Sequence, residues 1–516
     1  MKKYRKITAL AMSSAMVLAA LAGCAGGKGK DETTTATQVD TTAEQTAAAS
    51  TEAPTAAPTE APTKATREEP TMIHWLPKKF GRDIKIISQR ESVLDNTWRG
   101  GLLVLDGAEA KTVYQEDLAD QIRTSMKEME DFYGALSPYT IHLDTLDVGS
   151  DYYIQITSSI TAGDPIGQII EIEPEWVAGL MNNKMFAPLE KLSTLNFKEE
   201  KWNQNVLKMT SFSGHIYGMS PDREVGYGVF FNKKLLQEVG FGAEDLYDLQ
   251  KNGTWTWSEF EKVLKACTRD TDDDGTPDTW GMAGFGSEYF SAAIHASGAD
   301  FVTKDEKGYF VNQMDSEDLL SALTWADEMR QKYSKPQSEQ SVASDSVDDF
   351  NKGEAALLVA REDVRSKLTA DDWGFVMFPC PDGKELIATD MTSVFFIPSF
   401  YTSDEANEIA LVFDLLTDPV PGYCEPEDVW REACYDFYKD GRTVDETLQQ
   451  MKYGKNVKPC EELYVKNLYD ADIVSNFLQP LAAGKITPAE GIKANMEKWK
   501  EIIEDQNKSL DALLAY

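Results

Sequence analysis

The chain has 516 residues, with 51 Lys and Arg against 86 Asp and Glu, a formal net charge of −35 and only four histidines. This length suffices for two or three domains, and a hydrophobic fraction of 42% is typical of a globular protein. The acidic excess excludes nucleic acid and an anionic membrane surface as expected docking partners, because both need neutralisation by Lys and Arg.

The first 24 residues have the pattern of an export signal. Basic residues within positions 1–6 precede an apolar run over 7–22 that is too short for a stable membrane-spanning helix. The run ends at Leu21-Ala22-Gly23-Cys24, which resembles the bacterial lipoprotein signal. This resemblance implies a signal peptide over residues 1–23 and a Cys24 that carries acyl chains, palmitate among them, on the outer face of the cytoplasmic membrane. A plain secreted protein is the alternative.

Residues 25–70 consist almost wholly of Thr, Ala, Glu, Pro and Gly and contain no aromatic residue. Such a composition cannot build a core, so it predicts a disordered tether over residues 24–80. By flexible-chain scaling this tether spans roughly 35–40 Å, which would let a folded domain stand away from the membrane.

The remainder of the chain alternates between strand and helix patterns. Runs of β-branched and aromatic residues predict buried strands over 84–88, 139–143, 227–231, 355–359, 375–378 and 394–397. Helix-start patterns occur near Glu116, Ser316 and Thr402, and capping boxes are expected at Thr256 with Glu259 and at Thr487 with Glu490. Strands interleaved with helices predict α/β layers with largely parallel sheets, in which ligands gather at the carboxyl ends of strands.

The residue types that carry most enzyme chemistry are missing or scattered. There is no Gly-x-Ser-x-Gly, Ser-x-x-Lys, His-Glu-x-x-His or Walker loop, and the histidines are far apart in the sequence. The five cysteines after Cys24 are odd in number and show no Cys-x-x-Cys spacing, so we expect buried, unpaired thiols. We predict that the protein is not an enzyme and needs no organic cofactor. A surface hydrolase that uses a carboxylate pair remains a remote alternative.

One segment has the pattern of a calcium site. Carboxylates at positions 1, 3, 5 and 9 of residues 270–281, with Gly275 at position 6, match an EF-hand-type loop. The position of the bidentate Glu is taken by Gly281, so the loop is incomplete. We predict a structural Ca²⁺, and an acidic solvated turn is the alternative. The expected ligands are Asp270, Asp272, Asp274, Thr276 and Asp278.

Several motifs follow one another in order along the chain. They begin with the stretch from Gly214-His-Ile-Tyr-Gly-Met-Ser-Pro to Phe231-Asn232-Lys233 and the helix ending at Gly240. Thr254-Trp-Thr-Trp-Ser-Glu-Phe, the loop at 270–281 and segments at 350–357, 373–384 and 392–399 follow. Together these motifs resemble family 1 extracellular solute-binding proteins of ABC importers. In that resemblance the Trp-rich stretch is the next helix start, and the loop is similar to a calcium loop found in some members.

The resemblance implies an α/β fold of the two-lobed periplasmic-binding-protein type, class II, in which the lobes close around a solute. Lobe 1 would hold 81–222 and 374–420, and lobe 2 would hold 223–373 and 421–516. The implied partners are a small solute and the subunits of an ABC permease, with the membrane held through the lipid, and we expect a monomer. The residues expected to touch the solute are Trp98, Trp176, Glu224, Tyr227, Arg361, Glu362 and Trp373.

The expected function is a receptor for a carbohydrate or oligosaccharide, and two departures from the family pattern bear on this. Residues 163–167 read Gly-Asp-Pro-Ile-Gly where the family often has Gly-Asp-Pro-Asp. After the strand at 355–359, Ala360-Arg361-Glu362 replaces a Gly-Ser-Trp-like turn. An Arg beside a Glu suits hydrogen bonding to hydroxyl, carboxylate or amide groups more than flat stacking on a sugar. A peptide or other polar organic solute is therefore the alternative.

Overall fold

The computed structural model describes residues 83–88, 103–106, 109–112, 140–145, 151–338, 341–417 and 440–514, together with 430–431, 434–435 and 437–438. Cys24, Trp98, the whole of the predicted signal peptide and tether (residues 1–80) and the helix expected near Glu116 lie outside the described residues. Among the described residues, no helix combines the length and apolar character that crossing a membrane requires.

The first of two four-stranded sheets has the order β15 (Val394–Phe396), β5 (Ile169–Ile172), β1 (Asp83–Ser88) and β4 (Thr140–Thr145). Strand β1 pairs in parallel with β4 and β5, whereas β15 is antiparallel to β5. Successive side chains of β1 point to opposite faces of the sheet, so they enter two different hydrophobic clusters. Ile86 packs with the residues of α11 (Ser403–Thr417), and Ile87 packs with Tyr152 of α2 (Asp151–Ala162).

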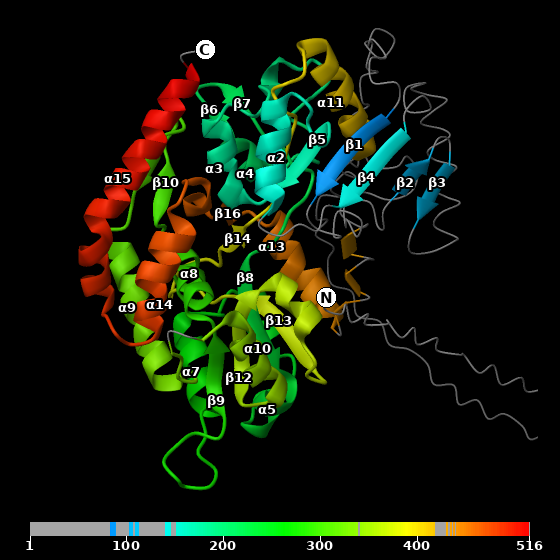
Figure 1. Cartoon of the computed structure of the whole chain (residues 1–516). Coiled ribbons are helices and arrows are strands. Elements are labelled where there is room, and N and C mark those ends of the chain that lie inside the picture. Colours follow the sequence, from blue (N-terminus) through cyan, green and yellow to red (C-terminus); the bar gives the residue numbers. More distant parts are fainter. Residues whose placement is uncertain are drawn as a thin grey trace, which may run out of the picture. The chain divides into compact units, whose positions relative to one another are not determined.

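The second sheet has the order β13 (Trp373–Met377), β8 (Tyr227–Asn232), β12 (Ala355–Arg361) and β9 (Trp280–Gly284). Strand β8 is antiparallel to both neighbours, and β12 is parallel to β9. The prediction of largely parallel sheets is therefore wrong for this sheet. Helices α5 (Lys233–Glu238), α7 (Trp257–Cys267), α8 (Gly286–Ser297) and α10 (Ala343–Lys352) contact its strands (Figure 1).

Two neighbouring segments carry the chain between the sheets. Val225 pairs with Asp390 and Met219 with Phe395, both antiparallel, and the amide of Gly226 donates to the carbonyl of Thr389 over 2.9 Å. A Cβ at Gly226 would lie 2.1 Å from Thr389 Oγ1, so this close approach needs glycine. These two segments, residues 219–226 and 388–395, are called the crossing. Strand β8 leads from the crossing into the second sheet, and β15 leads from it into the first sheet. This path explains why each of the two strands is antiparallel to the strands with which it pairs.

The predicted lobe boundary between 373 and 374 is wrong. Strand β13 pairs with β8 over Trp373–Met377, so these residues belong to the second sheet, and the chain returns to the first sheet only after β14 (Ala388–Asp390). The boundary fails because it cuts through a strand that is paired with β8 along its whole length.

Segments outside the two sheets contact elements that lie beside each of them. The hairpin of β10 (Val302–Lys304) and β11 (Phe310–Asn312) was predicted in lobe 2. Its Lys304 Nζ donates to the carbonyl of Met209, the last residue of α4 (Gln204–Met209), and to the carbonyl of Ser211. Burial lowers the pKa of Lys304 to about 7.

Helix α15 (Pro488–Leu514), also predicted in lobe 2, contacts α3 (Pro174–Asn182) and α9 (Glu317–Tyr333) (Figure 1). The side-chain amides of Asn182 and Gln506 exchange two hydrogen bonds of 3.0 and 3.2 Å.

Shorter elements complete the described chain. They are β2 (Leu103–Asp106), β3 (Glu109–Thr112), η4 (Leu189–Lys191), β6 (Ser211–Phe212), β7 (His215–Ile216), α6 (Asp245–Lys251), η5 (Glu362–Lys367), η6 (Thr443–Leu448), α13 (Gln449–Tyr453), β16 (Val457–Pro459), η7 (Glu461–Tyr464), η8 (Tyr469–Leu478) and α14 (Gln479–Ala482). Strand β16 pairs in parallel with β14 beside the crossing.

Candidate ligand-binding cleft

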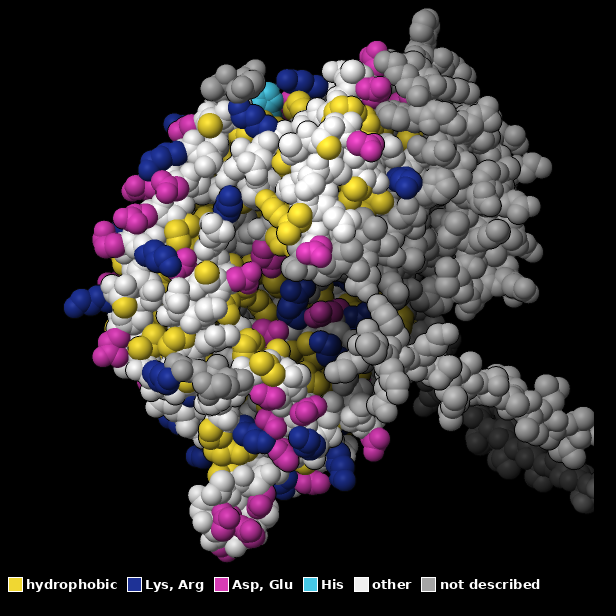
Figure 2. Space-filling view, viewed as in Figure 1, with side chains coloured by type: hydrophobic (Ala, Val, Ile, Leu, Met, Phe, Trp, Pro, Cys, Tyr) yellow, Lys and Arg dark blue, Asp and Glu magenta, His cyan; other side chains and the backbone are white. Residues whose placement is uncertain are grey.

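A cleft of ≈ 440 Å³ is formed where elements of both sheets meet. Figure 2 shows a hollow near the centre of the view in which side chains of both charges gather. The residues that line the cleft are Glu173, Glu175, Trp176, Glu288, Ala343, Ser344, Val347, Leu358, Ala360, Arg361, Asp363, Val364, Lys367 and Asp470.

One wall follows the buried strand β5. The strand ends at Ile172, and Pro174 occupies the first turn of α3, where its missing N–H costs no hydrogen bond. This turn places Glu175 and Trp176 on the cleft. The indole of Trp176 is half-buried, with its ring centroid 5.8 Å from that of Tyr152 and 5.7 Å from that of Tyr153, so the packing of α2 fixes its position.

The facing wall comes from the second sheet. Arg361 ends β12, and Glu288 lies in the first turn of α8, directly after β9. Both side chains stand where β-strands end and helices begin, as is common for ligand sites in α/β folds. Arg361 Nε lies 3.6 Å from Asp363 Oδ1.

Carboxylates outnumber cations in the cleft. Five acidic residues line it against two basic ones, Arg361 and Lys367. Burial raises the pKa of Glu175 to about 7, with a further rise from the charge of Glu173. Burial also raises the pKa of Glu288 to about 7. Burial opposes the charge of Arg361, but Asp363, Tyr227 and further carboxylates raise its pKa overall. The acidic groups of the cleft can accept hydrogen bonds from a ligand, and Glu175 and Glu288 can also donate one when they are protonated near pH 7. The excess of acidic over basic residues disfavours anionic ligands.

Residues 270–278 form an exposed acidic loop away from this cleft. Asp270 Oδ2 accepts a 2.8 Å hydrogen bond from the amide of Gly275, which has φ of 90°. Carboxylate oxygens of Asp270, Asp272 and Asp278 all lie within 4.8 Å of one another.

The model of the bacterial extracellular solute-binding protein family matches residues 133–401. The chain belongs to this family. The predicted family is thereby confirmed, and its members are solute receptors.

Solved structures with the same fold include the sugar-binding protein MalE from Xanthomonas citri, with 14% identity, 82% of this chain and 98% of that chain covered and a TM-score of 0.55. A second is the cyclic α-maltosyl-1,6-maltose binding protein from Arthrobacter globiformis, with 14% identity, 82% and 99% covered and a TM-score of 0.56. A third is an ABC substrate-binding protein from Listeria monocytogenes in complex with cycloalternan, with 14% identity, 83% and 99% covered and a TM-score of 0.50. These likenesses confirm the predicted fold class. No curated protein sequence matches the chain.

Two of the residues predicted to bind the solute, Trp176 and Arg361, line the cleft of this solute-binding protein. Glu224 lies in the crossing, where its Oε1 accepts a hydrogen bond from the amide of Ser393. Tyr227 is buried and its hydroxyl lies 2.9 Å from that of Tyr469. Both Glu224 and Tyr227 raise the pKa of Arg361. They therefore favour the charged form of this cleft residue, although they do not line the cleft themselves.

The other two predicted residues of the described chain have packing roles. Glu362 pairs with Arg365 over 2.7 Å and accepts a hydrogen bond from the hydroxyl of Tyr438. Trp373 is only 2% exposed and packs against Phe230 and Tyr438. Trp373 was placed at the cleft because of the misplaced lobe boundary, whereas it begins a strand that is buried in the second sheet.

The acidic residues of the cleft are not among those predicted from the sequence. Glu173 and Glu175 directly follow the strand at 169–172, and Glu288 follows β9, so their position after buried strands was a usable signal. Asp470 and the α10 residues come from distant segments and carry no such signal.

Proposed function

We propose that this solute-binding protein is the membrane-anchored receptor of an ABC importer and that it binds a carbohydrate or oligosaccharide. The acid-rich cleft beside Trp176 carries the proposal. Carboxylates accept hydrogen bonds from hydroxyl groups, and an indole offers an apolar face to a sugar ring. The related MalE is a sugar-binding protein, and the Listeria monocytogenes protein was solved with cycloalternan.

A peptide or other polar organic solute is the second candidate. Arg361 favours it, because a guanidinium binds carboxylates and amide carbonyls in a fixed geometry. In both cases the two halves close on the solute, and the closed form is presented to the permease. The acyl chains on Cys24 would hold the receptor at the membrane.

Thermal unfolding in the presence of neutral glycans and of peptides tests the proposal. A glycan at 100 times its Kd should add roughly 2.7 kcal/mol to the free energy of unfolding and raise Tm, without product formation. Trp176→Ala should weaken glycan binding about 30-fold, or about 2 kcal/mol, because the stacking surface is lost.

The matched control is Trp257→Ala, since Trp257 is also half-buried but stacks on Trp325 at 3.9 Å outside the cleft lining. This variant should keep the wild-type affinity. A shift with peptides and none with glycans would favour the second candidate, and turnover of any compound would contradict a pure receptor.

We also propose that residues 270–278 bind a structural Ca²⁺ through Asp270, Asp272, Asp274, Asp278 and the carbonyl of Thr276. The converging oxygens of Asp270, Asp272 and Asp278 support this, because Ca²⁺ takes six to eight oxygen ligands.

After EDTA treatment, calcium added at ten times its Kd should raise the free energy of unfolding by about 1.4 kcal/mol. The same concentration of magnesium should raise it less. Calorimetry of the full chain checks this. Asp272→Asn should remove the calcium response, and Asp305→Asn, in the turn between β10 and β11, is the control that should keep it. A response that survives Asp272→Asn would place the ion elsewhere.

A further inference from the structure

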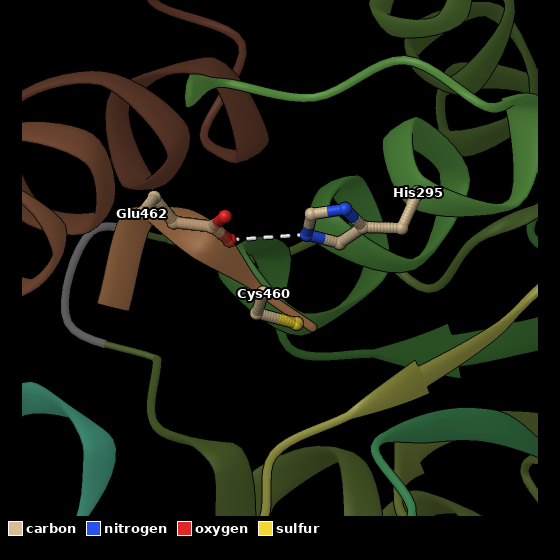
Figure 3. A group of neighbouring side chains, drawn as sticks. All are labelled: His295, Cys460 and Glu462. Atoms are coloured by element: carbon tan, nitrogen blue, oxygen red, sulfur yellow. Dashed lines mark hydrogen bonds and ion pairs between the residues drawn. The ribbon is translucent and has the colours of Figure 1, made fainter. Parts of the chain in front are cut away.

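We propose that His295, Cys460 and Glu462 form a second metal site, which binds Zn²⁺ inside the protein. Three separate positions of the chain supply the ligands: His295 lies in the last turn of α8, Cys460 follows β16, and Glu462 lies in η7. In Figure 3 the imidazole, the thiol and the carboxylate converge on one space. The exposed fraction of each residue is 2% or less.

The distances suit one small ion. His295 Nε2 lies 3.0 Å from Glu462 Oε1, and one ligand atom of each residue lies within 4.8 Å of those of the other two. Zn²⁺ binds imidazole nitrogen and carboxylate oxygen at about 2.0–2.2 Å and thiolate sulfur at about 2.3 Å. Neighbouring ligands of a tetrahedral ion therefore stand about 3–4 Å apart, and small side-chain movements bring these three to that spacing.

The surroundings of His295 orient it as a ligand. Its Nδ1 lies 3.4 Å from Asp300 Oδ1, in the turn that follows α8. A carboxylate on one imidazole nitrogen keeps the proton there and leaves the other nitrogen free to coordinate, and metal-binding histidines commonly have such a partner. Here that other nitrogen is Nε2, which points at Glu462 (Figure 3).

The ligand types also suit a divalent ion. An imidazole is a neutral ligand, whereas a thiolate and a carboxylate each carry one negative charge, and the three residues are buried together. A Zn²⁺ bound by the His295 imidazole, the Cys460 thiolate and the Glu462 carboxylate therefore leaves no net charge in the interior.

One buried atom lacks a partner in the metal-free arrangement. Glu462 Oε2 is buried and has no hydrogen-bond partner among the described residues. A buried polar atom without a partner is unfavourable, and more so when it belongs to a charged group. Bidentate binding of Zn²⁺ by Glu462 would give Oε2 a partner. The thiol selects zinc over calcium or magnesium, which prefer oxygen ligands, so this site and the loop at 270–278 should take different ions.

The ion would join segments that lead to both walls of the cleft. Helix α8 carries Glu288 in its first turn, and η7 contacts α3, which carries Glu175 and Trp176. Cys460 is also hydrogen-bonded through its amide to the carbonyl of Asp390 in the crossing, at 3.3 Å. Zn²⁺ at this place would fix the segment behind the crossing relative to α8.

Metal analysis of the full chain purified from zinc-supplemented medium, followed by dialysis against calcium, tests the site. The wild type should retain about one zinc ion per chain. Replacement of zinc by Co²⁺ should give the near-ultraviolet absorption of a thiolate–cobalt bond. Cys460→Ser should lose that absorption and lower the zinc content at least tenfold, and His295→Gln should also lower the zinc content.

Cys380→Ser is the matched control, because Cys380 is an equally buried free thiol that donates to backbone carbonyls, a role that Ser can keep. It should retain zinc and the cobalt absorption. A wild type that folds, yet holds no zinc and shows no thiolate–cobalt absorption, would overturn the proposal without any appeal to variants. So would equal zinc loss in Cys380→Ser.

Discussion

Replacement of Asp390 by alanine should lower the free energy of unfolding by about 3 kcal/mol and weaken solute binding. Asp390 is 6% exposed and lies in the crossing. Its Oδ2 accepts hydrogen bonds from the side chains of Asn203 and Asn205 at 2.9 and 3.0 Å, and its Oδ1 accepts from the amide and hydroxyl of Thr392. Hydrogen bonds to a charged group contribute about 1.5–3 kcal/mol, and buried donors left without acceptors add to the loss.

Denaturant unfolding and a binding assay with the identified solute check this result. Asp382→Ala is the matched control, because Asp382 also accepts two side-chain hydrogen bonds, from Thr256 and Ser258, but is exposed. Its loss should cost about 1 kcal/mol or less and leave binding unchanged. If Asp390→Ala is no worse than this control, the network does not hold the crossing.

The double variant Glu175→Gln/Glu288→Gln should become more stable relative to the wild type as the pH rises. Both carboxyls have a pKa raised to about 7 in the folded protein, above the ordinary value of 4.5. Between these values the folded state binds more protons than the unfolded state, so each group lowers stability as the pH rises through that window. Glutamine carries no charge and removes this dependence.

The expected gain of the double variant between about pH 5 and pH 8 is about 2–3 kcal/mol. One group contributes at most about 1.4 kcal/mol per pH unit, and partial exposure of the cleft reduces this. Parallel unfolding curves at several pH values measure the difference. Glu497→Gln is the control, because its side chain is 90% exposed on α15, and its curve should follow the wild type. A pH-independent difference for the double variant would show that these carboxyls titrate normally.

The sequence predicted most strands well because their side chains are buried on both faces and therefore form continuous apolar runs. Strands β8, β12 and β15 begin at the predicted residues. The capping box at Thr487 is confirmed, since the Thr487 hydroxyl and the Glu490 carboxylate each accept from the other's backbone amide. The box expected at Thr256 is wrong, because that hydroxyl donates to Asp382. A distant acceptor of this kind leaves no local pattern.

Strand direction and the lobe boundary could not be predicted from local patterns. Both depend on the path of the chain through the crossing, where residues near 225 and 390 meet. The cleft was predictable only in part for the same reason. Arg361 could be found because it ends a recognisable strand, and Trp176 because it follows one. Trp373 begins a strand too, and only its partners Phe230 and Tyr438 reveal that it is packed inside.

Helix α15 contacts α3 beside the first sheet and α9 beside the second, and the paired amides of Asn182 and Gln506 hold it to α3. Any change of angle between the halves must therefore bend this helix, slide it or break that pair. An optical reporter attached to its exposed face would convert solute occupancy into a signal. The same helix would limit how far the two halves of the empty receptor can open. Substitutions at Gln506 would weaken its hold on α3, and so offer a way to tune the solute affinity of such a sensor without altering the cleft.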